Sequence, residues 1–121
     1  MITDEQVIPS ILSVCPSFLC VYEASDDKEL PYCIMGELAH HLMGLQLRKE
    51  TGEFEPLCEV IERFHVDGVP TVRELATIGL LESIQNVWGN NSLDPEIFRF
   101  YLLPESQNRW DELNDFWKRI R

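Results

Sequence analysis

The sequence predicts an all-α fold, and three observations support this class. Apolar residues recur three and four positions apart along most of the chain, as on the buried face of a helix. No segment shows the alternation of polar and apolar residues that is typical of a half-buried strand. The chain has 121 residues, 45% of them hydrophobic and 26% charged, which suits one ordinary globular domain. We therefore expect residues 1–121 to form a single domain of about six or seven helices, arranged as a compact bundle or as a short stack like an α-solenoid.

Four helices are expected in the first half, and each is bounded by residues typical of helix starts and ends. A threonine followed by acidic residues caps the first, prolines open the second and third, and glycines follow the third and fourth. Pro9 lies inside the first of these helices and predicts a kink or an early end there. The expected ranges are 3–14, 16–23, 31–50 and 54–66, and the acidic segment 24–29 is expected to be a loop.

Three further helices are expected, beginning near residues 71, 94 and 104. Thr71 and Glu74 have the spacing of a capping box, in which each side chain bonds the backbone N–H of the other residue. The helix that they open should end near residue 89, and it is apolar on more than one side, so we expect neighbours around it. The three tryptophans of the chain are more typical of core anchors than of a ligand site; they are Trp88, Trp110 and Trp117.

The net charge is strongly negative and unevenly distributed. The chain has 21 Asp and Glu against 10 Lys and Arg, a formal charge of -11, and most of the excess lies in residues 1–70. Binding to phosphates requires a surplus of Lys and Arg, so we expect no direct contact with nucleic acid or with an anionic membrane. The same charge favours a basic protein partner, although simple solubility would also explain it.

The N-terminus and the cysteines predict a cytoplasmic protein. The first residues are acidic where a secretory signal would need positive charge, and no apolar run approaches the roughly 18 residues of a membrane span. The four cysteines include no C-x-x-C pair, so we expect free thiols rather than disulfides or zinc ligands. We expect no metal and no cofactor. The cysteines are Cys15, Cys20, Cys33 and Cys58.

Two Glu-x-x-His pairs, Glu37 with His40 and Glu62 with His65, have the spacing found in carboxylate-bridged di-iron bundles. Such a site needs both pairs to face one common core. On a helical wheel, Glu37 and His40 point away from the apolar face of their helix, and Glu62 lies opposite the apolar face of the next helix. We therefore predict no di-metal site, and a carboxylate-bridged metalloprotein is the third of three hypotheses about function.

The sequence carries no recognisable catalytic signature. It has no phosphate-binding glycine loop, no G-x-S-x-G, no H-E-x-x-H and no cysteine placed with a histidine in a known pattern. His41 lies at the edge of an apolar helix face, where a hydrogen-bonded boundary residue is expected ahead of a general base. We expect a protein that is not an enzyme.

Acidic residues of the first half form the candidate binding surface. Three glutamates fall on the side of their helix opposite its buried face, and three more acids lie in the preceding loop. A solvated helix face would give the same pattern, whereas a docking surface for a basic protein would use the charge to speed association and fix orientation. The candidate residues are Glu55, Glu59 and Glu62 on the helix, and Asp26, Asp27 and Glu29 in the loop.

The second half resembles a known family. Its segments are VRELATIGLLESI at 72–84, DPEIFRFYLLPES at 94–106 and WDELNDFW at 110–117. In their pattern of apolar and turn positions they are similar to small all-helical immunity proteins of bacterial contact-dependent inhibition and other polymorphic toxin systems. The resemblance implies a cytoplasmic protein that binds and neutralises the toxin domain encoded beside it. Such toxins are commonly nucleases, whose basic surfaces an acidic inhibitor complements.

Two function classes therefore lead. The first is a toxin-neutralising immunity protein that binds its toxin in a stoichiometric complex, either covering the toxin's active site or holding it away from its substrate. The second is a helical adaptor or scaffold that binds a peptide or a regulatory partner through a concave surface.

Overall fold

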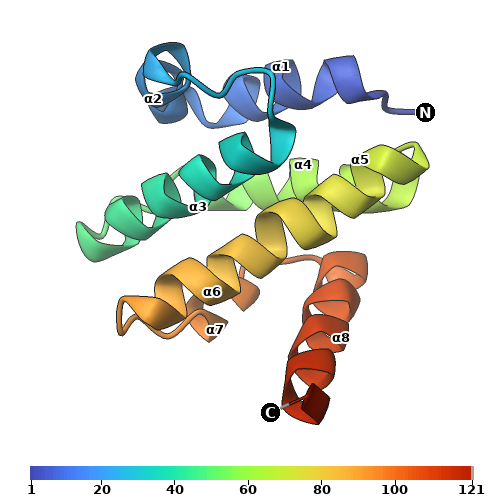
Figure 1. Cartoon of the computed structure of the whole chain (residues 1–121). Helices are drawn as coiled ribbons and strands as arrows, with labels where there is room; N and C mark the ends of the chain where they lie inside the picture. The colour runs from blue at the N-terminus through green and yellow to red at the C-terminus, as the bar shows by residue number, and fades with distance from the viewer. Residues whose placement is uncertain (121) are drawn as a thin grey trace.

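The computed structural model describes residues 1–120, and these residues form helices joined by short connections (Figure 1). The predicted all-α class is confirmed. Within the described residues, the only β-type pairing is a single bridge between Ile2 and Gly68. In chain order the elements are α1 (Asp4–Val14), η1 (Pro16–Phe18), α2 (Leu19–Ala24), α3 (Pro31–Leu47), α4 (Phe54–Asp67), α5 (Pro70–Glu74), η2 (Leu75–Leu81), α6 (Glu82–Asn90), α7 (Glu96–Arg99) and α8 (Pro104–Ile120).

The first helical segments turn sharply at Cys15 and Pro16. α1 begins after Thr3 as predicted, and the Gln6 side chain accepts a hydrogen bond from the Thr3 N–H at 2.9 Å. The helix does not end at Pro9, because burial of neighbouring apolar side chains outweighs the one backbone hydrogen bond that proline cannot make. Pro16 then opens η1, and the axis bends by 107° between α1 and the segment Pro16–Ala24.

α5, η2 and α6 follow one another without a break and form one long rod through the middle of the molecule (Figure 1). The rod contacts α3, α4 and α8, as predicted for a helix with neighbours on more than one side, but Ile78 and most of α5 are exposed. The middle third of the rod is a π-helix, which the sequence pattern did not predict. The predicted capping box is also wrong. The rod begins at Pro70, and the Thr71 hydroxyl instead donates to the Asp4 carboxylate of α1 at 2.8 Å.

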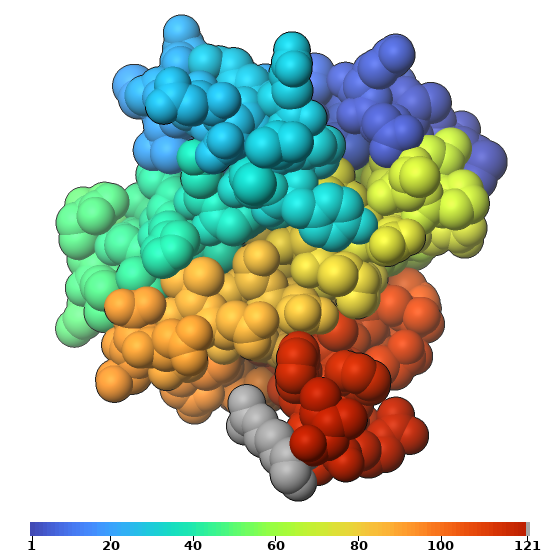
Figure 2. Space-filling model, viewed as in Figure 1, coloured from blue at the N-terminus to red at the C-terminus, as the bar shows by residue number. Residues whose placement is uncertain are grey.

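α3 packs closely along this rod. A Cβ atom added at Gly79 of η2 would lie 2.9 Å from Leu75 Cδ1 and 3.2 Å from Met35 Cγ, so the glycine permits the close approach. In the space-filling view, α1 and α2 cover one end of the molecule and α8 covers the opposite end (Figure 2). The rod and α3 therefore lie between the two ends.

The tryptophans confirm the core prediction in two cases of three. Trp88 and Trp110 are fully buried, and each indole N–H has a partner: the Ala39 carbonyl at 3.1 Å and the Glu96 carboxylate at 2.8 Å. Trp117, nearer the end of α8, is only partly buried. The two buried indoles anchor α6 and α8 to the rest of the chain, and a cluster of buried apolar residues runs through both halves.

Within residues 1–120, no single helix is both long enough and apolar enough to cross a bilayer, although the sharply bent pair of α1 with Pro16–Ala24 meets those criteria when taken together.

Candidate functional site

Five of the six acidic residues predicted to bind a partner lie at the surface, four of them exposed and Asp27 partly exposed. Glu55 and Glu59 are exposed on α4, and the other three lie in the loop between α2 and α3. No ion pair within residues 1–120 neutralises any of the five. The loop's one lysine, Lys28, donates instead to the backbone carbonyls of Glu23 at 2.7 Å and Ser25 at 3.1 Å. The loop residues are Asp26, Asp27 and Glu29.

Glu62 differs from the prediction, because it is only partly exposed and both of its carboxylate oxygens accept hydrogen bonds from α8. One oxygen accepts from the Glu105 N–H at 3.0 Å, and the other accepts from the Ser106 N–H at 2.9 Å and the Ser106 hydroxyl at 2.8 Å. Burial acts to raise the Glu62 pKa, but these hydrogen bonds and the nearby His65 lower it overall. Glu62 therefore caps the start of α8, and its assignment to an outward acidic stripe is wrong.

A helical wheel could not predict the position of the Glu62 carboxylate, because a wheel describes the faces of one helix and not the contacts between helices. It correctly separated the buried face of α4 from the opposite side, where Glu55 and Glu59 are exposed. It could not show that α8 packs on α4 and presents unpaired backbone N–H groups there. A carboxylate beside a helix N-terminus is held by those donors and by the helix dipole.

His65 belongs to the same network and is buried, at 6% exposure. Ser106 gives its hydroxyl hydrogen to Glu62, so His65 Nδ1 donates to Ser106 at 2.8 Å, and Nε2 accepts from the Thr77 hydroxyl at 3.0 Å. Burial lowers the His65 pKa to about 4, and Arg109 adds to this effect while Glu62 and Glu105 oppose it. The neutral imidazole thus links α4, η2 and α8.

The two Glu-x-x-His pairs do not converge. Glu37 accepts a hydrogen bond from Ser25 at 3.0 Å, and His40 is exposed. Glu62 and His65 are used in the contacts to α8 and η2. Within residues 1–120, neither pair belongs to a group of ligand atoms close enough to hold a metal.

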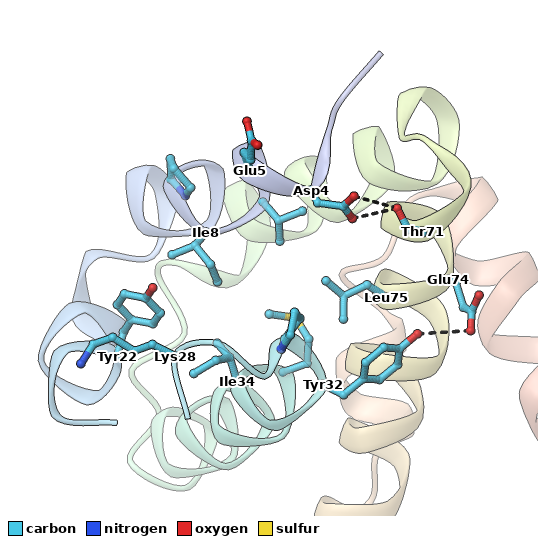
Figure 3. Close-up of a pocket in the computed structure, with 14 residues that line it drawn as sticks. Asp4, Glu5, Ile8, Tyr22, Lys28, Tyr32, Ile34, Thr71, Glu74 and Leu75 are labelled. Carbon is cyan, nitrogen blue, oxygen red and sulfur yellow. Dashed lines mark hydrogen bonds between the residues drawn. The ribbon is translucent and has the colours of Figure 1, made fainter. Parts of the chain in front are cut away.

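A groove of about 640 Å³ lies between α1, α2, α3 and α5 (Figure 3). Apolar side chains from three separate segments face the cavity, among them Ile8, Ile34 and Leu75. The sequence pattern did not predict this groove, because it arises where α1 crosses over α3 and α5 without filling the space between them.

Acidic residues border the groove. The Asp4 and Glu74 carboxylates each accept a hydrogen bond from a hydroxyl. The Thr71 hydroxyl donates to Asp4 at 2.8 Å, and the Tyr32 hydroxyl donates to Glu74 at 3.3 Å (Figure 3). Glu5 also lines the groove, and its exposed carboxylate points away from the apolar floor. Burial first, and Glu74 second, raise the Tyr32 pKa, so its hydroxyl remains a donor.

The acidic loop adjoins the groove at one end. Lys28 and Pro31 line the cavity, and the three acids of the loop lie within the five residues before Pro31. Lys28 is the one cation in the lining, and its ammonium also lies 5.9 Å from the centre of the Tyr22 ring. The groove is therefore apolar inside and predominantly acidic around its edge.

A second polar cluster joins the end of α1 to α3 and α4. The Ser17 hydroxyl donates to Glu53 Oε1, and because its hydrogen is used there, His41 Nε2 donates to Ser17 at 2.8 Å. The Cys15 thiol also donates to Glu53, at 3.2 Å. His41 is a hydrogen-bonded histidine at the edge of the apolar face, as the sequence predicts, whereas its partner Ser17 could not be predicted from the sequence.

The protons in this cluster are arranged for hydrogen bonding rather than for nucleophilic catalysis. Burial, supported by Glu53, raises the Cys15 pKa to about 12, so the thiol stays protonated. Burial lowers the His41 pKa, with Arg48 adding to this and Glu53 opposing it. Burial acts to raise the Glu53 pKa, but bonds from Ser17 and Cys15 lower it overall. A general base would have to accept the Ser17 proton, whereas here His41 donates to that oxygen.

The four cysteines are all free of disulfides, as predicted. Cys15 and Cys58 are buried, and Cys20 and Cys33 are exposed. Burial raises the Cys58 pKa strongly, which makes it an inert core thiol.

Residues 8–118 match a family described as a domain of unknown function, DUF7674. No curated protein and no solved structure matches the chain. Because the matched segment covers nearly the whole sequence, the chain belongs to the DUF7674 family.

Proposed function

We propose that this protein is a non-enzymatic inhibitor that binds a basic protein partner through the groove and the acidic loop beside it. The observation that carries the proposal is the combination of an apolar floor with a predominantly acidic border. A contact segment with one apolar side chain between lysines or arginines fits both parts, because the side chain is buried in the groove while the cations meet the border.

The charge of the whole chain supports the same type of partner. A net charge of -11 repels nucleic acid and attracts a protein of opposite charge over distances of about a Debye length. The five surface acids form no ion pairs within residues 1–120, so they are available to a partner's cations. Glu62 is left out of the proposed surface because both of its oxygens are already occupied.

The partner we propose is a bacterial toxin domain encoded beside this protein, with a nuclease as the expected activity. The support for this step is the resemblance of the second half to immunity proteins, together with the basic surface that a nuclease needs to hold phosphates. The inhibitor would act in the cytoplasm by forming a stoichiometric complex.

An adaptor is the second candidate, because the groove is also suited to a peptide from a regulatory partner. Expression of the neighbouring gene with and without this protein distinguishes the two. The inhibitor proposal expects that the neighbouring product alone stops growth and that co-expression restores it. Normal growth without this protein, or growth arrest that co-expression leaves unchanged, would favour the adaptor.

A variant in the groove tests whether the rescue of growth depends on the groove. Ile8 lies in the groove lining and is only partly buried, so Ile8→Glu should put a charge on the apolar floor and abolish rescue. Ile78, on the exposed side of η2, provides the matched control Ile78→Glu, which should rescue like the wild type. Circular dichroism and the melting temperature of both variants separate loss of binding from loss of folding.

A further inference from the structure

We propose that Cys15, His41 and Glu53 form a mononuclear site for a transition metal of the zinc type. One ligand atom from each residue, the Cys15 thiol sulfur, a ring nitrogen of His41 and a Glu53 carboxylate oxygen, lies within 4.8 Å of the other two. The site is distinct from the groove and does not depend on the proposed inhibitor function.

Three separate elements hold these ligands. Cys15 follows the last residue of α1, His41 lies in α3, and Glu53 directly precedes α4. The backbone at Cys15 is fixed, because the Cys15 N–H donates to the Ile11 carbonyl at 2.8 Å and the Cys15 carbonyl accepts from the Phe18 N–H at 3.0 Å. Ligands held by such fixed backbone need only side-chain rotation to meet a metal.

The size of the cluster suits tetrahedral coordination. Zinc bonds of about 2.0 Å to nitrogen or oxygen and about 2.3 Å to sulfur place neighbouring ligand atoms roughly 3.2 to 3.6 Å apart. The Cys15 sulfur already lies 3.2 Å from Glu53 Oε1. The Ser17 hydroxyl also borders the cluster, 3.8 Å from that sulfur and 2.8 Å from His41 Nε2.

The ligand types select the metal. A thiolate and an imidazole favour zinc and disfavour magnesium or calcium, which prefer sets of oxygen atoms alone. Binding would break the Cys15 S–H bond, form a sulfur–metal bond and release the thiol proton to solvent. For Nε2 of His41 to bind the metal, the ring proton would have to move from Nε2 to Nδ1. Cys15 is buried, whereas His41 and Glu53 are partly exposed, so an ion can enter from the solvent side.

The test uses the full chain with both exposed cysteines replaced, Cys20→Ser and Cys33→Ser, so that surface thiols bind no metal. The protein is treated with a chelator, dialysed and titrated with Zn²⁺ in competition with a chromophoric chelator. The proposal expects about one Zn²⁺ per chain, as for a single tetrahedral site. Titration with Co²⁺ should produce a thiolate-to-cobalt charge-transfer band.

Two pairs of variants in this background decide the ligand assignment. His41→Ala should weaken zinc binding by more than about 100-fold, beyond the usual effect of losing a supporting contact, whereas exposed His40→Ala should not. Glu53→Gln should weaken it, and exposed Glu50→Gln should not. Cys15→Ser should remove the cobalt band.

Three results would contradict a metal site at Cys15, His41 and Glu53. No zinc uptake by the parent protein would show that the cluster is a hydrogen-bond network only. A cobalt band that survives Cys15→Ser, or equal zinc affinities for His41→Ala and His40→Ala, would place the metal elsewhere. Because Cys15 lies in the core, the His41 pair gives the decisive comparison if Cys15→Ser does not fold.

Discussion

At the scale of single residues, His65 is expected to make the stability of the protein depend on pH. Its imidazole is buried and neutral, with a partner on each nitrogen, and Glu62, Glu105 and Arg109 are the charged groups around it. A proton on Nε2 would break the hydrogen bond from Thr77, since that nitrogen would no longer accept. Protonation is therefore disfavoured by both burial and geometry.

This environment predicts a pH-dependent free energy of unfolding. The His65 pKa is about 4 in the folded protein against 6.5 for an ordinary histidine, so the unfolded chain binds the proton more tightly. Stability from this group is complete above pH 6.5 and falls by about 3 kcal/mol as the pH decreases towards 4. Urea unfolding between pH 4 and pH 7 measures the slope.

Two variants isolate the contribution of His65. His65→Gln should be less stable at pH 7 and should lose most of the slope between pH 6.5 and pH 4. His40→Gln, at an exposed position on α3, should keep the wild-type slope. Parallel pH profiles for the wild type and His65→Gln would show that the histidine is not the titrating group.

At the scale of elements, the connection between α4 and α5 depends on one glycine. Gly68 directly follows the last residue of α4, as the sequence predicts. The observed φ of -79° is open to any residue. The requirement is instead one of space, because a Cβ there would lie 2.3 Å from the Phe64 carbonyl oxygen. The same connection also pairs with the backbone of Ile2. The Ile2 N–H donates to the Asp67 backbone carbonyl at 2.8 Å, and the Val69 N–H donates to the Ile2 backbone carbonyl at 2.9 Å.

Gly68→Ala should therefore destabilise the protein by about 1 to 3 kcal/mol, because backbone atoms must shift. Gly36→Ala is the matched control, since a Cβ at Gly36 meets nothing within 4 Å and the residue lies within α3. That variant should be neutral or more stable by up to about 1 kcal/mol. Equal effects of the two substitutions in chemical unfolding would contradict the steric explanation.

Element positions could be predicted from local signals, whereas contacts between elements could not. Proline and threonine marked the starts of α1, α3 and α8, because helix capping depends on residues adjacent in sequence. The capping box predicted for Thr71 is wrong, because the Thr71 hydroxyl binds Asp4, 67 residues away in the sequence. The outward position predicted for Glu62 is wrong for the same reason, because the N–H groups that it binds belong to α8. The π-helix of η2 also left no clear trace in the apolar pattern.

At the scale of the whole molecule, the fold places part of the negative charge beside an apolar groove. The sequence predicted the identity of the acids and their concentration in the first half, but the groove that they border exists only after α1 crosses α3 and α5. Glu55 and Glu59 on α4 remain a prediction from sequence. Reversing both to lysine should slow association with a basic partner and leave the fold intact, because both are exposed and point away from the core.

The most direct test of the account is the rate of association with the neighbouring gene product, measured by stopped flow at low and high salt. Reversing charges beside the groove with Glu5→Lys and Glu29→Lys should slow association about tenfold at low salt and weaken its salt dependence. The same charge change on α8, through Glu112→Lys and Asp115→Lys, should have a much smaller effect. Equal effects of the two reversals, or none from the groove-side pair, would contradict binding through the acidic border of the groove.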